Sequence, residues 1–409
     1  MNPYDGNTIF YKLYVCIRAM LNKSSSEKVW TGKRALTMIA LIGCISIYGI
    51  TSSLLTPLLS LILEARGVGS IFIGGLAMAA PTGLIIGAFT VSRVMRNFGG
   101  RSILLVGVVL EIALIFALMN TQSLLAWFLI RFLGGISDSL LFVVTETWIV
   151  EITPSEHRGR VMGFYNSILM MSFALGPLTL SLSGTKGFLP FLICIGLLGV
   201  AGLPLLLIES YVPSNRDKPR FGVFSFAFVA PLLALACFVV AFQDLSITSL
   251  MPVYGLRIGM TESNATLMLF FGIAGGALLQ FPIGWAADHF DPRKVLVACA
   301  LSGLIGAAIW PFTAFLPYLL WATLFLWWGL FSGVTTVAMI LAGHWFRGAE
   351  LATAMAAFGV FWGMGAFVGP LTSGAIMELW NPHGLPLTLI IVAGIFFMIT
   401  LFPRFYRPP

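Results

Sequence analysis

The feature that most constrains the fold is a series of apolar runs, each long enough to cross a membrane. Of the 409 residues, 58% are hydrophobic and only 10% are Asp, Glu, Lys or Arg, whereas soluble domains average about 25% charged residues. One membrane-spanning helix needs about 20 apolar residues. The sequence therefore argues against an ordinary cytosolic enzyme, a disordered chain and a secreted disulfide scaffold, and it predicts an all-α membrane protein.

Twelve such runs can be placed, six on each side of the longest polar stretch between spans. We predict two pseudo-symmetric six-helix bundles over 35–211 and 223–409, a cytoplasmic linker over 212–222 and a basic cytoplasmic extension over 1–34. The runs cover 36–63, 70–94, 102–119, 124–152, 159–183, 188–211, 223–256, 264–288, 294–313, 317–345, 349–378 and 384–403.

The distribution of basic residues supports this arrangement. With both termini in the cytoplasm, 19 of the 23 Lys and Arg fall in inside segments, as the positive-inside rule requires. Outside loops keep Arg66, Lys186 and Arg257, and Arg131 lies within a span. The net charge of +7 then reflects topology and lipid contact. Because the basic residues form no contiguous patch, we expect no nucleic-acid partner.

The two halves resemble each other in three places at nearly one offset. Duplicated membrane bundles bind their substrate near the bilayer midplane, where the halves meet, and work by rocking around it. The matches pair Thr56–Leu59 with Met251–Tyr254 at an offset of 195, Arg96–Arg101 with Asp288–Arg293 at 192, and Leu175–Thr179 with Val368–Thr372 at 193.

Three motifs resemble a known family. The stretch Gly284–Lys294, in which Asp288 precedes a basic cluster, is similar to the loop signature of the major facilitator superfamily. Arg131-Phe-Leu-Gly134-Gly135 resembles the Arg-x-x-x-Gly motif of its proton-coupled members, and 365–374 resembles the antiporter motif of drug–proton exchangers. The resemblance covers 35–409 and implies the major facilitator fold, with twelve transmembrane helices.

Finer features point to one branch of that superfamily. Thr145–Trp148 followed by Arg158-Gly159-Arg160 resembles a poorly characterised bacterial branch of sugar- or drug-efflux type, which implies a bacterial inner (plasma) membrane. Two departures leave the direction of transport open. The first half has no acid between Gly87 and Arg101, and the fuller antiporter motif lies in span 11 rather than in span 5.

Five ionisable residues lie well inside predicted spans, where each charge costs about 2.5–3.5 kcal/mol. They are Glu111 in span 3, Arg131, Asp138 and Glu146 in span 4, and Asp244 in span 7. At 100° per residue, Arg131 and Asp138 share one helix face within about 20°, and Glu146 lies about 80° from Asp138. Span 4 is therefore not expected to face lipid.

Each of these residues has a functional and a structural interpretation. Arg131 is either a cation in the proton or substrate pathway, or the partner of Asp138 or Glu111 in an ion pair that holds helices together. Glu146 is a candidate proton carrier, because a carboxylic acid in apolar surroundings can exchange a proton near neutral pH; the alternatives are a helix contact or a place at the cytoplasmic end of the span.

The remaining acids divide in the same way. Asp138 is balanced between the two roles, and Glu111 is favoured as structural. Gln243 and Asp244 are predicted site residues, because span 7 lines the cavity in the superfamily that the chain resembles.

Further residues are predicted to work during conformational change. Asp288, Arg293 and Lys294, together with Arg96, Arg101 and Arg158, are candidates for a cytoplasmic gate that closes by contacts between charges and helix ends; the alternative is topology charge alone. The pairs Gly176-Pro177 and Gly369-Pro370 are predicted helix kinks, because Gly and Pro weaken helix hydrogen bonding and allow close packing.

The leading functional hypothesis is a secondary active transporter that exports a small organic molecule by alternating access and is coupled to protons through Glu146 or Asp244, with Arg131 nearby. The alternatives are a proton-coupled importer of a sugar, organic acid or peptide, and a non-transporting sensor or assembly partner. The chain has no GxxxxGK[ST] sequence for direct ATP drive and no nucleophile–base or metal constellation. We therefore expect no enzyme activity, cofactor or metal, and a monomer whose partners are substrate, protons and lipid.

Overall fold

The structure, a computed structural model, describes residues 32–153, 157–209, 225–314, 316–346, 349–402 and 406. The linker predicted over 212–222 lies outside the described residues, as does the predicted basic extension up to residue 31. Within the described ranges the regular structure is entirely helical.

The helices follow the twelve apolar runs closely. Ten of them are at least 18 residues long and apolar enough to cross a membrane, and α7 and α14 are apolar helices of 17 residues, near the lower limit for a span. The first half holds α2 (Gly32–Ala65), α3 (Ser70–Phe98), α4 (Gly100–Asn120), α5 (Leu124–Ile152), α6 (Arg158–Ser183) and α7 (Leu189–Leu205); the second holds α8 (Phe226–Val229), α9 (Pro231–Arg257), α10 (Glu262–His289), α11 (Pro292–Thr313), α12 (Pro317–Trp345), α13 (Ala349–Leu379) and α14 (Gly384–Thr400).

The seventh run differs from its prediction, because it is not one continuous helix. Ala230 separates the short α8 from α9 and has φ −138° and ψ 66°. Proline disfavours the helical conformation in the residue before it and is favoured at the first position of a helix, so Pro231 ends one helix and starts the next. The sixth and twelfth runs also extend beyond their helices, which end at Leu205 and Thr400.

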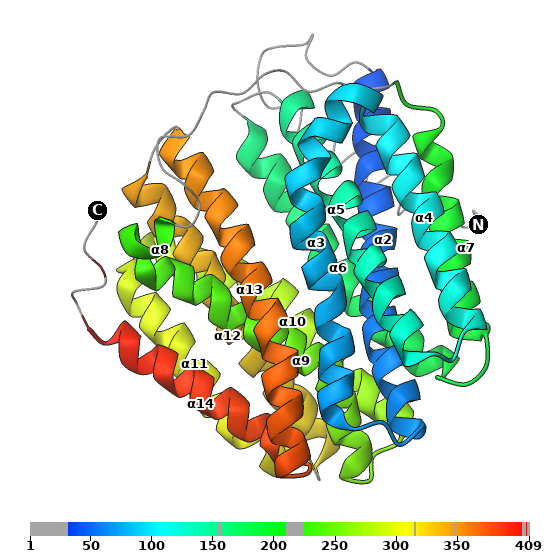
Figure 1. The fold of residues 1–409 in the computed structure, drawn as a ribbon. Coiled ribbons are helices and arrows are strands. Elements are labelled where there is room, and N and C mark those ends of the chain that lie inside the picture. Colours follow the sequence, from blue (N-terminus) through cyan, green and yellow to red (C-terminus); the bar gives the residue numbers. More distant parts are fainter. Residues whose placement is uncertain are drawn as a thin grey trace, which may run out of the picture.

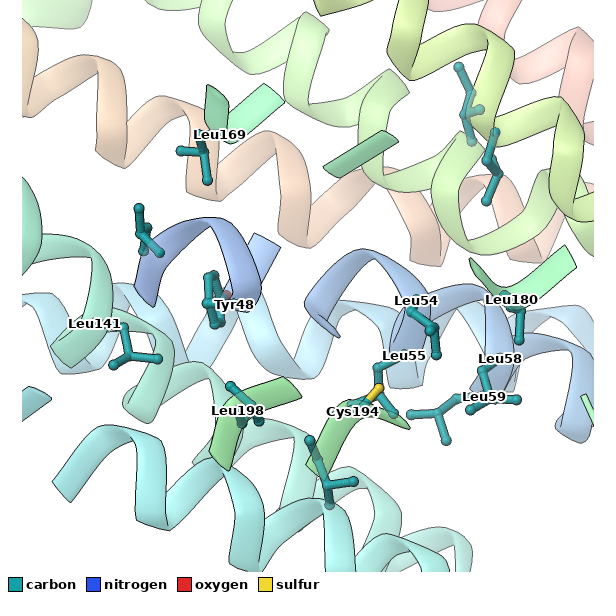
Figure 2. Packing of buried hydrophobic residues seen from close by; sticks show 14 of the residues in the cluster. Tyr48, Leu54, Leu55, Leu58, Leu59, Leu141, Leu169, Leu180, Cys194 and Leu198 are labelled. Carbon is teal, nitrogen blue, oxygen red and sulfur yellow. The ribbon is translucent and has the colours of Figure 1, made fainter. Parts of the chain in front are cut away.

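The helices form two bundles side by side, α2–α7 and α8–α14 (Figure 1). Between the bundles α3 packs on α13, α6 packs on α10, and α2 packs on α9. The α3–α13 and α6–α10 contacts are equivalent under the repeat, and α2 and α9 are themselves repeat-related, as expected for two halves related by a pseudo-two-fold axis. In the first half α2 lies at the centre of the core. Figure 2 shows Leu54, Leu55, Leu58 and Leu59 along α2, close to Cys194 of α7.

Two repeat-related glycines mark close approaches of helices within each half. A Cβ added at Gly176 of α6 would lie 2.0 Å from Ser53 Oγ of α2, and one added at Gly369 of α13 would lie 2.3 Å from the Phe242 carbonyl oxygen of α9. Both α6 and α13 continue as helices through Pro177 and Pro370. The Gly-Pro pairs therefore allow tight helix packing at the same place in each repeat.

We predict that Gly369→Ala lowers the unfolding temperature of the detergent-purified protein by several degrees, because overpacking costs about 1–3 kcal/mol. Gly359→Ala in the same helix is the matched control, since an added Cβ there meets nothing within 4 Å. Equal unfolding temperatures for the two variants would contradict the close packing of α13 on α9.

Candidate functional site

Three of the predicted ionisable residues meet inside the first half. Glu111 of α4 and Arg131 and Asp138 of α5 line one small cavity together with Tyr48 of α2. The cavity has a volume of about 10 Å³, which is about the space that one water molecule needs. Each of the three charged residues is less than a tenth exposed. We call Glu111, Arg131 and Asp138 the acid–arginine cluster.

The glycines beside Arg131 explain how the cluster is assembled. A Cβ at Gly135 would lie 1.9 Å from the Ala80 carbonyl oxygen, so α3 can approach α5 only at a glycine. Gly134 faces the other neighbour, because its Cβ position is 3.8 Å from Glu111 Oε1. Ser137 adds a hydrogen bond of 3.0 Å to the Gly107 carbonyl of α4. The glycines of the Arg-x-x-x-Gly sequence thus allow α3 and α4 to pack closely against α5.

Hydrogen bonding in the cluster is incomplete. The Arg131 guanidinium donates to the Thr56 hydroxyl at 3.4 Å, and Glu111 Oε1 is buried without a hydrogen-bond partner. Among the described residues, no ion pair within 4.0 Å joins Arg131 to Asp138 or Glu111, so the pair considered from the sequence is not formed in this conformation. Two acids and one guanidinium around so small a cavity form a site whose charge changes when a proton binds.

The other predicted site residues lie elsewhere. Glu146 is exposed on α5, fifteen residues and roughly 22 Å along the helix from Arg131. Asp244 of α9 accepts a hydrogen bond of 2.9 Å from Trp328 Nε1 of α12. Gln243 is fully buried, and neither its amide nitrogen nor its oxygen has a partner. Arg131 therefore neighbours Glu111 and Asp138, and neither Glu146 nor Asp244 shares its cavity.

An ion pair closes one end of the molecule across the two halves. Arg257 at the end of α9 donates from Nε and Nη2 to the two carboxylate oxygens of Glu64 at the end of α2, both at 2.7 Å. The side chains are only 16% and 19% exposed, and Arg257 also donates to the Asn381 side chain at 3.0 Å. Bidentate bonds between charged groups are among the stronger polar contacts in proteins.

Further polar contacts between the halves lie at the same end, at the bottom of Figure 1. Glu378 of α13 accepts the backbone N–H of Ile71 in α3 at 3.0 Å, and the hydroxyls of Ser181 in α6 and Ser263 in α10 are 2.7 Å apart. Thr185 donates to Glu262. We call this the sealed end, and Figure 1 shows the helices of the two halves diverging toward the opposite end.

The predicted gate residues lie at the opposite end, and two of them bind within their own half. Arg101 at the start of α4 donates to the Leu206 carbonyl just beyond α7, at 2.8 Å. The repeat-related Arg293 at the start of α11 donates to the Tyr406 carbonyl beyond α14, at 3.0 Å. Asp288 and Lys294 are exposed.

The side chains of the other two gate candidates, Arg96 and Arg158, lie outside the part of the chain that the structure describes. The cytoplasmic gate therefore stays a prediction.

Comparison with known protein families identifies the family to which this architecture belongs. The model of the Major Facilitator Superfamily matches residues 41–339 and 259–409. The chain belongs to the Major Facilitator Superfamily. It is a multi-pass membrane transporter of that superfamily, as the sequence predicted.

Two similar relatives are named as uncharacterised MFS-type transporters. The chain is 27% identical over 378 residues to the uncharacterised MFS-type transporter YfkF of Bacillus subtilis, covering 87% of this chain and 90% of that protein. It is 24% identical over 337 residues to the uncharacterised MFS-type transporter YcaD of Escherichia fergusonii, covering 80% and 85%.

Solved transporter structures share the fold at low sequence identity. The nucleoside transporter NupG matches with a TM-score of 0.74 and 12% identity over 92% of this chain and 98% of its own. The D-xylose–proton symporter matches with a TM-score of 0.67 and 15% identity over 92% and 98%.

We predict that the double variant Ser181→Cys, Ser263→Cys forms a disulfide on mild oxidation, because the two hydroxyls touch across α6 and α10. Adding Arg257→Glu slows cross-linking several-fold, because it leaves like charges facing each other at Glu64. Lys186→Glu, an exposed charge change near the same end, is the control. Cross-linking at an unchanged rate in Arg257→Glu would show that the ion pair does not hold the sealed end closed.

Proposed function

We propose that this protein is a proton-coupled secondary transporter that exports a small organic molecule by alternating access. The observation that carries the proposal is the acid–arginine cluster, buried in the first half of a duplicated bundle. Charged groups inside a membrane are costly and are commonly retained for function, and this cluster has an unpartnered carboxylate oxygen.

Protonation of the cluster supplies a physical basis for coupling. With both acids ionised, Glu111, Asp138 and Arg131 carry a net charge of −1, and one bound proton makes the site neutral. A change of charge in a medium of low dielectric constant alters the relative free energy of two conformations that expose the site differently to water. The proton gradient can therefore drive the change between the two states.

The sealed end supports alternating access. The positive-inside distribution predicts that Glu64 and Arg257 face the outside, so the conformation described is closed to the outside. Opening the other way requires the Glu64–Arg257 pair and the Ser181–Ser263 contact to separate. Export is favoured over import by the antiporter-like stretch 365–374 and by the resemblance to an efflux branch; a proton-coupled importer is the alternative.

Everted vesicles test the proposal, using protein expressed in bacterial membranes. The interior is acidified by respiration and followed with acridine orange, while organic cations, nucleosides, sugars and organic acids are added singly. A compound that is exported in the cell enters these vesicles in exchange for protons, so it raises the dye fluorescence. An imported compound would instead accumulate in right-side-out vesicles with an acidic exterior.

We predict that Glu111→Gln combined with Asp138→Asn lowers this proton exchange at least about tenfold, because neither side chain can then change charge. Glu151→Gln, a charge loss elsewhere on α5, leaves it near the wild-type rate. Substrate movement that ignores the pH gradient, or full exchange in the double variant, would contradict proton coupling through the cluster.

A further inference from the structure

Asp244 is a carboxylate at the centre of the second half. It is the middle residue of α9, thirteen residues from Pro231 and thirteen from Arg257. Its side chain is partly exposed, although most of the surrounding helix is buried. Binding sites of duplicated transporters lie near the midplane, where the halves meet, and Asp244 has that depth.

Among the side chains that the structure describes, no cationic group forms an ion pair with Asp244. The helices packed on α9 are α2, α3, α8, α10, α12, α13 and α14, and neither α8 nor α14 has a charged residue. The charged and histidine residues of the other five lie near helix ends, while Arg257 of α9 itself is bound to Glu64. Those whose side chains the structure describes are Arg34 and Glu64 in α2, Glu262, Asp288 and His289 in α10, His344 in α12, and Glu350 and Glu378 in α13.

The carboxylate is held by one donor that is built in from another helix. Trp328 Nε1 donates to Oδ1 at 2.9 Å, and an indole N–H can only donate. The indole ring packs against α10 at Gly272. Only a glycine leaves room for it there, because an added Cβ would lie 2.1 Å from the Trp328 ring. This arrangement fixes the carboxylate and leaves Oδ2 for a ligand.

The second half does not repeat the acid–arginine cluster. At the repeat offset of 193, the residues in place of Glu111, Arg131 and Asp138 are Leu304, Leu324 and Phe331, so the acid–arginine cluster occurs once. Its cavity has room for about one water molecule, which suits a proton and excludes an organic molecule. The two kinds of charged site are therefore divided between the halves.

We propose that Asp244, positioned by Trp328, binds the positively charged group of an organic cation, which is the substrate class of this transporter. The inference rests on the proposed transport function and names its cargo. A carboxylate at mid-membrane depth without a cationic partner is stabilised by binding an opposite charge. Hard metal cations prefer several oxygen ligands, and the described residues contain no group of three or more His, Cys, Asp or Glu that could hold a metal ion.

A neutral polar strip continues from this site along α12. Gln280 of α10 donates to Ser332 at 3.0 Å and accepts from Thr336. Ser332 and Thr336 lie about one and two helical turns beyond Trp328 on α12. They therefore supply hydrogen-bonding groups for the remainder of a cationic molecule. An aromatic ring beside a carboxylate also suits an organic ammonium or phosphonium group.

Binding to the purified full-length protein tests the inference with two probes of the same shape and opposite charge, tetraphenylphosphonium and tetraphenylborate. Equilibrium dialysis of radiolabelled tetraphenylphosphonium gives the dissociation constant. We expect saturable binding that tetraphenylborate does not displace. Asp244→Asn weakens binding about 30-fold, as for loss of one partner in a shielded charge pair, and Trp328→Phe weakens it several-fold. Asp244→Glu keeps measurable affinity, and Glu350→Gln is the charge-loss control.

The outcomes separate this inference from the proposed function. Absence of saturable tetraphenylphosphonium binding, equal affinity for the anion, or an unchanged dissociation constant in Asp244→Asn would overturn the organic-cation site. Proton exchange with a neutral or anionic compound in vesicles would then leave the transport proposal standing. Conversely, Asp244-dependent binding without any movement driven by the pH gradient would support the site and contradict proton coupling. Monodisperse elution and a wild-type unfolding temperature of Asp244→Asn exclude misfolding as the cause of lost binding.

Discussion

Exclusion of charge from the membrane interior governs how this molecule is organised. Ionised side chains at mid-membrane are costly, and most charged residues of the packed helices lie near helix ends. The exceptions deep in the bundles form two separate arrangements: the acid–arginine cluster, in a cavity that holds about one water molecule, and Asp244, fixed by the Trp328 indole. The first suits a proton and the second suits a larger cation, so the halves of a duplicated protein have acquired different chemistry.

The duplication itself explains how the sealed end is built. Glu64 and Arg257 are 193 residues apart, within two residues of the offset of 195 that relates α2 to α9, so they lie at corresponding ends of these two repeat-related helices. A pseudo-two-fold axis brings equivalent positions near the axis into contact, and opposite charges at those positions attract. The same symmetry places Gly176 and Gly369 at corresponding helix contacts. Packing is thus shared by both repeats, whereas the charged residues deep in the two halves differ.

The sequence predicted the fold well, because apolar length and the alternation of basic loops are properties of single segments. It missed the break at Ala230, where a local proline effect overrides hydropathy. The meeting of Arg131 with Asp138 follows from helix periodicity, whereas the approach of Glu111 depends on glycine contacts between helices. The role of Trp328 could not be predicted from the sequence, since nothing in its local sequence distinguishes it from other aromatic residues. The Glu64–Arg257 pair had a visible signal in opposite charges at repeat-equivalent positions.

The central claim is that the two ends of the bundle open alternately. Paired spin-label distances test it most directly, using Phe72→Cys with Leu379→Cys at the sealed end and Gly163→Cys with His289→Cys at the opposite end, each pair in a background without native cysteines. The account predicts that adding Arg257→Glu lengthens the first distance and shortens the second in the same fraction of molecules. Lengthening at the sealed end with no change at the opposite end would contradict it.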